Sequence, residues 1–151
     1  MPRVVLDTSI IIEYIDKEAE FQDKAKAIFA SLIRGELEAI VPHPILAEAY
    51  YVSAKIYRKI GMKEPHSLSS ELVEWLFRLP SVTAPSENKD LAVEAGKAKL
   101  QYCLALTDCY VLAASKVYNC KALFRKPESE MSRNLNALKR AYQLVFLSDY
   151  R

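Results

Sequence analysis

Hydrophobic residues along the chain form two kinds of pattern, short continuous runs and longer stretches with helical spacing. The short runs are typical of buried strands, and they predict strands at residues 4–6, 37–41, 81–84, 121–124 and 144–147. Apolar positions three and four residues apart predict helices at residues 10–15, 20–33, 44–59, 68–79, 86–100, 108–118 and 132–140. Strands that alternate with helices of this length favour an α/β fold whose mainly parallel sheet is covered on both faces.

Polar residues mark where several of these helices should begin. Thr8 or Ser9 is expected to cap the first helix, Ser86 the one that includes Glu87, and Thr107 the one that starts at Asp108. Residues 61–67 contain Gly, Pro and His and predict a loop. With 151 residues, of which 51% are hydrophobic, the chain is expected to form one domain over residues 1–151.

Three acidic residues stand in unusually apolar or small-residue surroundings. Asp7 follows a buried-type strand, Glu48 lies between alanines, and Asp108 precedes a run of small and apolar residues. An unpaired charge in a dry environment costs several kcal/mol or more, so each needs a partner. Asp7 is expected at the carboxyl end of a strand, where α/β sheets place their ligand crevice. A shared metal ion is one hypothesis; a helix cap at Asp7 and helix-dipole stabilisation by Asp108 are the alternatives.

Other polar and aromatic residues are interpreted as structural. Glu13 and Asp16 are expected to face solvent, and His43 and His66 lack a companion ligand or catalytic partner. Aromatic residues on helices are expected to pack in the core or a subunit interface, with base stacking as the alternative. These are Tyr50, Tyr51, Tyr57 and Trp75.

Cysteine content and charge indicate the compartment and the kind of substrate that suit this chain. Cys103, Cys109 and Cys120 lack metal or redox spacing and are expected to be buried free thiols in a reducing compartment. No signal-like or membrane-spanning segment is evident, so we expect a cytoplasmic protein without membrane contact. The net charge is only +2, but residues 116–140 are basic. A basic edge near an acidic pocket suits a phosphodiester substrate, and a solvated helix face is the alternative.

These features together resemble the PIN domain family of metal-dependent ribonucleases, in particular the VapC-like toxins of toxin–antitoxin pairs. The resemblance covers nearly the whole chain, and it depends on the order and spacing of short motifs. They are Val4-Val5-Leu6-Asp7-Thr8-Ser9, Glu48 in an apolar helix, Ala95-Gly96, and Leu104-Ala105-Leu106-Thr107-Asp108-Cys109.

The resemblance implies an α/β/α sandwich in which carboxylates hold Mg²⁺ or Mn²⁺ for RNA hydrolysis. Asp7 and Asp108 would be the principal catalytic metal ligands and Glu48 would complete the cluster, often through water. Ser9 or Thr8 would orient Asp7, with Thr107 as a further supporting residue. The family also implies an antitoxin partner and a homodimer or higher homo-oligomer.

The chain departs from the family pattern after the fourth strand, where another aspartate is usual. Lys126 occupies that place, although a shift of a few residues would bring in Glu128 or Glu130. A lysine facing the pocket would oppose cation binding, and this raises the prospect of reduced activity. Arg125 and Lys126 are candidate RNA contacts.

Three functions compete on this evidence. A metal-dependent endoribonuclease is the leading hypothesis. A catalytically weakened PIN-like domain that binds RNA or protein is the main alternative. A metal-dependent phosphatase is disfavoured because the close Asp-x-Asp pair expected after the first strand is missing.

Overall fold

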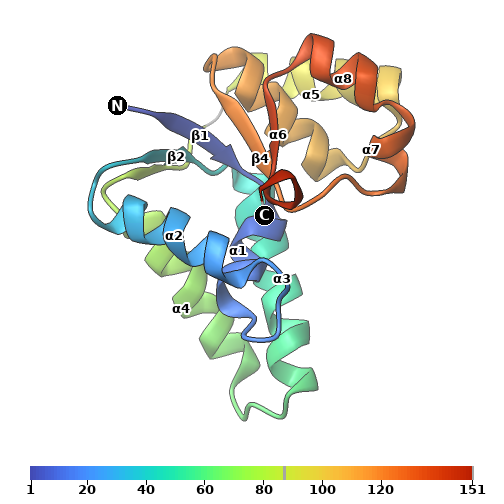
Figure 1. Ribbon diagram of the computed structural model, residues 1–151. Helices are drawn as coiled ribbons and strands as arrows, with labels where there is room; N and C mark the ends of the chain where they lie inside the picture. Colours follow the sequence, from blue (N-terminus) through green and yellow to red (C-terminus); the bar gives the residue numbers. More distant parts are fainter. Residues whose placement is uncertain (87, 151) are drawn as a thin grey trace.

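The sheet organises the fold of the computed structural model, which describes residues 1–86 and 88–150. It has five strands in the order β3-β2-β1-β4-β5, and every neighbouring pair is parallel (Figure 1). All five predicted strands are present. Their bounds are β1 (Arg3–Leu6), β2 (Glu38–Ile40), β3 (Val82–Thr83), β4 (Lys121–Phe124) and β5 (Leu144–Phe146).

Helices α1 to α4 gather on one side of the sheet and α5 to α8 on the other (Figure 1). This division follows from right-handed crossovers, because the strand order moves outward from β1 to β3 and then returns to β4 and β5. The predicted α/β/α sandwich is confirmed. The helices are α1 (Thr8–Ile15), α2 (Gln22–Ile33), α3 (His43–Lys59), α4 (Pro65–Arg78), α5 (Lys89–Tyr102), α6 (Leu106–Val117), α7 (Ser129–Arg133) and α8 (Leu135–Ala141), followed by a short 3-10 turn (Leu147–Asp149).

Strand register brings the carboxyl ends of β1, β2 and β4 to one edge. Val5 lies opposite Ile40 of β2, and Leu6 lies opposite Leu123 of β4. The residues that follow these strands therefore emerge side by side at the edge where parallel sheets form their ligand crevice. Asp7 is one of them.

Aromatic stacking joins α1, α2 and α4. The ring of Phe29 stacks on Tyr14 at 4.2 Å between centroids and on Trp75 at 5.8 Å. The predicted packing role of Trp75 is confirmed. Tyr51 differs, because 49% of it is exposed and its hydroxyl donates to Glu48.

Several helix starts differ from the prediction. Asp7, rather than Thr8 or Ser9, is the N-cap of α1. Helix α6 begins at Leu106, so Thr107 lies inside its first turn and the predicted cap is wrong. Asn88 caps α5 in place of Ser86, and its side chain accepts from the backbone N–H groups of the first turn; Glu87 lies outside the described residues.

Two further differences concern segments near the ends of helices. Helix α4 starts at Pro65, inside the predicted loop, because proline suits the first helical turn. The single helix predicted at residues 132–140 is two short helices, α7 and α8, which meet at Asn134.

The cysteine prediction is confirmed for two of three residues. Cys109 and Cys120 are buried free thiols, whereas Cys103 is exposed in the left-handed conformation that ends α5. No described helix combines the length and apolar character that a membrane crossing requires.

Candidate functional site

Asp7 is fixed at the carboxyl end of β1 by both neighbouring elements. Its backbone N–H donates to the carbonyl of Leu123 at 3.0 Å, which continues the pairing of β1 with β4. Its carboxylate Oδ2 accepts from the backbone N–H of Ser9 at 3.1 Å and from the Ser9 hydroxyl at 2.6 Å. Ser9 therefore orients Asp7, as hypothesised. The bond from the Ser9 backbone N–H is a helix-capping interaction, so the helix-cap alternative accounts for Oδ2.

The other carboxylate oxygen of Asp7 is not explained by capping. Oδ1 is buried and has no hydrogen-bond partner among the described residues, and only 6% of Asp7 is exposed. A buried acceptor without a partner loses its hydration, which costs about 1–3 kcal/mol. The Thr8 hydroxyl is likewise buried without a partner, so the expectation that it orients Asp7 is wrong for its side chain. Oδ1 is the oxygen that a ligand would satisfy.

Asp108 lies in the first turn of α6, close enough to Asp7 for the two carboxyls to affect each other's titration. Burial, followed by the charges of Asp7 and Glu48, raises the pKa of Asp108 to about 7. Burial is also the largest cause that raises the pKa of Asp7 to about 6, against the lowering effect of its hydrogen bonds from Ser9. Two such neighbouring acids bind a proton more tightly than isolated aspartates do, and a bound cation would compete with that proton.

Glu48 joins the two aspartates from α3. Its Oε2 accepts from the Thr107 hydroxyl at 3.0 Å and from the Tyr51 hydroxyl at 3.4 Å. Thr107 thus supports the site through Glu48 rather than as a helix cap. Because the Glu48 charge raises the pKa of both Asp7 and Asp108, the three acids share one electrostatic site.

The chemistry of this site suits a hard divalent cation. Mg²⁺ prefers carboxylate oxygens and commonly uses one or two of them together with water. Asp7 Oδ1 and the Asp108 carboxyl are the groups that fit this role. Over residues 1–86 and 88–150, no set of three or more His, Cys, Asp and Glu side chains is placed so that it could hold a metal ion. The metal roles of Asp7, Glu48 and Asp108 stay predictions.

The residues that could take the missing aspartate's place after β4 lie on the surface. Lys126 is exposed, and so are Glu128 and Glu130. Glu128 still contributes to the raised pKa of Asp108 through its charge, so it lies nearer the site than its exposure alone suggests. Glu128 remains the better candidate for a fourth acid.

Arg125, a candidate RNA contact, already has a partner within the protein. Its guanidinium forms an ion pair with Glu13, and the guanidinium carbon lies 5.5 Å from the centre of the Phe21 ring. Glu13 also accepts from the backbone N–H of Phe21 at 2.8 Å. The expectation that Glu13 faces solvent is wrong, since only 5% of it is exposed.

The backbone N–H of Arg125 links this ion pair to the acidic site. The Arg125 N–H donates to the Ser9 hydroxyl at 3.0 Å, and the same hydroxyl donates to Asp7. The sequence did contain a signal for Glu13, because it lies three residues after Ile10 on the buried face of α1. A buried cationic partner for Glu13 could not be located from the sequence, because Arg125 is more than a hundred residues away.

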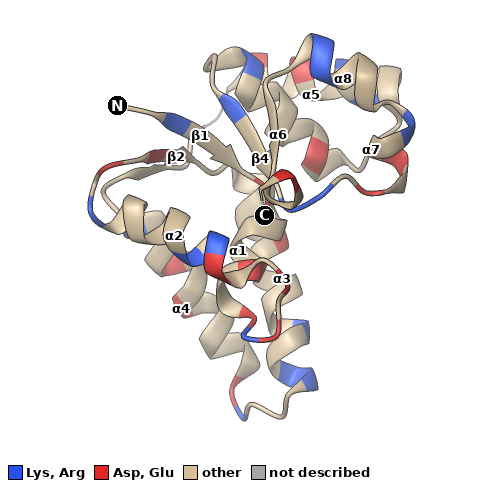
Figure 2. Cartoon of the chain, in the orientation of Figure 1, with Lys and Arg blue, Asp and Glu red and all other residues tan. Residues whose placement is uncertain are grey.

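The basic segment 116–140 is divided between two ends of the sheet. Lys121 opens β4 opposite Val4, at the edge remote from Asp7, and Lys116, Lys139 and Arg140 line a surface hollow near that edge. Figure 2 shows basic positions on α8 and at the start of β4. Arg125 and Lys126 directly follow β4, at the edge of the sheet where Asp7 lies, so they are the part of the basic segment that the strand order brings to this edge.

Comparisons with known proteins place these observations in a family. A family model described as "PIN domain" matches residues 4–126. No match was found among curated proteins.

Solved structures show the same fold at low sequence identity. The VapC20 toxin of Mycobacterium tuberculosis, described as cleaving the Sarcin-Ricin loop, is 15% identical with a TM-score of 0.58, over 78% of this chain and 84% of that one. VapBC2 from Rickettsia felis, solved with a DNA fragment from its promoter, is 12% identical with a TM-score of 0.64, over 95% of this chain and 98% of that one. Similarity at these identities establishes a shared fold.

The raised pKa values predict how stability depends on pH in metal-free protein. Because Asp7 and Asp108 bind protons more tightly when folded, their contribution is fully present below about pH 4 and is lost as pH rises through about 6 to 7. Asp108→Asn should therefore raise the free energy of unfolding at pH 8, by the order of 2 kcal/mol, and flatten its decline between pH 5 and 8. Urea unfolding in EDTA measures both effects. A decline as steep as that of wild type would contradict the assignment.

Breaking the buried ion pair should destabilise the protein. Glu13→Gln leaves the partly buried Arg125 guanidinium with only the exposed Glu20, 3.8 Å away, as a counter-charge, and we expect a loss of about 1–3 kcal/mol in the free energy of unfolding. Glu36→Gln is the matched control, because Glu36 pairs with Arg34 on the surface. Urea unfolding of both variants tests this, and equal effects would show that the Glu13 pair has no structural role.

Proposed function

Since the chain belongs to the PIN domain family, we propose that it is a metal-dependent endoribonuclease and the toxin of a toxin–antitoxin pair. The buried, unpartnered Oδ1 of Asp7, next to Asp108, carries this proposal. A purely structural aspartate would have both oxygens satisfied by the protein. The site also lies at the carboxyl edge of the sheet, where a long polymeric substrate has access.

Each acidic residue has a distinct role in the proposed reaction. Asp7 and Asp108 would hold the Mg²⁺ or Mn²⁺ ion, and Ser9 keeps Asp7 in its orientation by hydrogen bonding. Glu48, which accepts from the Thr107 hydroxyl, would complete the acidic cluster. When bound, the ion supplies the positive charge that stabilises the negative charge developing on the phosphate and favours ionised water as the nucleophile.

The alternative function is an RNA- or protein-binding module with little or no turnover. One observation favours it. Lys126 occupies the place of the usual fourth acid, and the neighbouring Arg125 forms an ion pair with Glu13. RNA binding without cleavage in either Mg²⁺ or Mn²⁺, by protein free of antitoxin, would support this alternative.

The proposed partners are RNA, an antitoxin and a second copy of the chain. The likeness to VapBC2 supports an antitoxin partner, and we propose that this partner covers the acidic pocket. A homodimer is supported by a stripe on α5, where Val93 and Leu100 are exposed by 48% and 86%. Gly96 lies between them with open space in front of it, which would let another backbone approach closely.

Removing either principal ligand should abolish RNA cleavage. Loss of a residue that only orients a metal ligand typically reduces activity roughly 10–100-fold. Ser9→Ala should reduce the cleavage rate within that range, and Asp7→Asn and Asp108→Asn should each reduce it by more. Glu74→Gln, on the distant surface of α4, is the control. Gel assays of a labelled RNA in Mg²⁺ and in Mn²⁺ report these rates. Full activity of Asp7→Asn would contradict the proposed function.

A charge placed in the α5 stripe should separate the copies. We expect Leu100→Asp to convert a dimer into monomers, because an aspartate buried in an apolar interface loses its hydration. Sedimentation velocity of wild type, Leu100→Asp and the surface control Glu74→Gln measures the state. Wild-type protein that sediments as a monomer across micromolar concentrations would refute the dimer.

A further inference from the structure

A second recess lies at the same edge of the sheet as the three acids. Its volume is about 740 Å³, within the range of small-molecule sites. Pro42 follows β2 and Pro85 follows β3, and the backbone N–H of Val41 donates to the Thr83 carbonyl at 2.9 Å. The proposed chemistry of Asp7, Glu48 and Asp108 does not use this recess.

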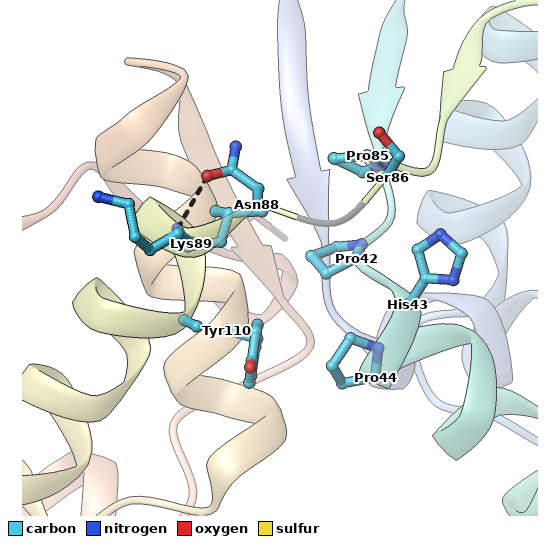
Figure 3. A pocket seen from close by; sticks show the side chains of 10 residues that line it. Pro42, His43, Pro44, Pro85, Ser86, Asn88, Lys89 and Tyr110 are labelled. Carbon is cyan, nitrogen blue, oxygen red and sulfur yellow. Dashed lines mark hydrogen bonds between the residues drawn. The ribbon is translucent and has the colours of Figure 1, made fainter.

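The walls are largely apolar, and prolines form part of them. Figure 3 shows Pro42 and Pro85 on one side of the recess, with Tyr110 of α6 and Pro44 of α3 on either side of its lower part. Proline rings lock the backbone torsion φ, and Asn88 fixes the first turn of α5 by accepting from the N–H of Leu91 at 3.3 Å. Rigid walls reduce the entropy that a ligand loses on binding.

The recess and the acidic site share two helices. Pro44 lies four residues before Glu48 on α3, and Tyr110 lies three residues after Thr107 on α6. Residues at these spacings are neighbours on a helix surface, with Cβ atoms about 5–6 Å apart. Glu48 and Thr107 are hydrogen-bonded to each other, so the recess opens one helical turn from the acids.

The lining chemistry indicates what kind of group fits. Among the residues that the structure describes, those that line the recess include Lys89 and no acid. Flat apolar faces with a tyrosine are typical of sites that hold an unstacked base of single-stranded RNA. A phosphate at the acids would leave the base of an adjacent nucleotide within reach of Tyr110.

We propose that this recess, defined by Pro42, Pro44, Pro85 and Tyr110, is a subsite for one unpaired nucleobase next to the cleaved bond. This subsite follows from the proposed ribonuclease function. It makes the substrate a single-stranded or looped RNA in which one base can turn outward, and it makes Tyr110 the residue that stacks on that base.

The test measures RNA affinity in the full-length Asp108→Asn protein, so that cleavage does not interfere. The probe is a fluorescent, unstructured 12-nucleotide RNA, together with a series in which each nucleotide in turn is abasic. Tyr110→Leu removes the ring, Tyr110→Phe keeps it, and Tyr57→Leu removes an aromatic ring from the recess between α1, α3 and α4. Thermal unfolding verifies that every variant is folded.

Stacking of one base predicts that Tyr110→Leu weakens binding about 5- to 100-fold, whereas Tyr110→Phe and Tyr57→Leu bind like the parent. One abasic position should weaken binding of the parent by a similar factor. Removing the base at that position should not weaken the binding of Tyr110→Leu further, because the base and the ring form one contact. The abasic series on the parent decides the question even if Tyr110→Leu does not fold.

Other results overturn the subsite without ambiguity. Equal affinity of the parent for every abasic RNA, or equal binding by Tyr110→Leu, would assign the recess to another class of partner, such as an apolar protein segment. Parallel cleavage assays on the wild type separate the two proposals. Cleavage with no dependence on Tyr110 would reject the subsite alone, whereas base-dependent binding without cleavage would reject the ribonuclease function alone.

Discussion

The burial of Asp7 beside two other acids is the constraint on which this structure depends. Asp7 and Asp108 lie far apart in the sequence, and burial is the largest cause that raises the pKa of both above the usual range of aspartate. Glu48 adds a third acid whose charge raises both values further. The fold holds these groups together although their separation would relieve the repulsion, and such unfavourable arrangements are concentrated at functional sites.

The surrounding structure resists this repulsion with ordinary interactions. The Ser9 hydroxyl lies between the Asp7 carboxylate and the backbone of Arg125, and Arg125 is in turn paired with the buried Glu13. A chain of contacts therefore runs from the loop before α2 to the end of β4 and then to Asp7. The net stability of a domain is a small difference between large favourable and unfavourable free energies. These contacts therefore help the folded state to tolerate an unfavourable acidic site.

The sequence predicted the elements of this fold better than the details of its site. Alternating buried runs and amphipathic stretches located all five strands because parallel strands are hydrophobic throughout and their crossovers are helical. The order of the acidic motifs indicated the family. The first residues of the helices were harder to predict. The N-caps Asp7, Asn88 and Ala105 differ from the predicted ones because capping depends on backbone angles that the sequence does not specify. Glu13 was misjudged because its partner Arg125 is distant in sequence and only the folded chain brings them together.

Diffraction from crystals soaked in Mn²⁺ tests the central claim most directly, because anomalous scattering locates the ion independently of activity. The account predicts a peak bounded by Asp7 Oδ1 and the Asp108 carboxylate, with Glu48 near the ion's water. It would be contradicted by a crystal without a peak there in which a protein group already bonds to Asp7 Oδ1.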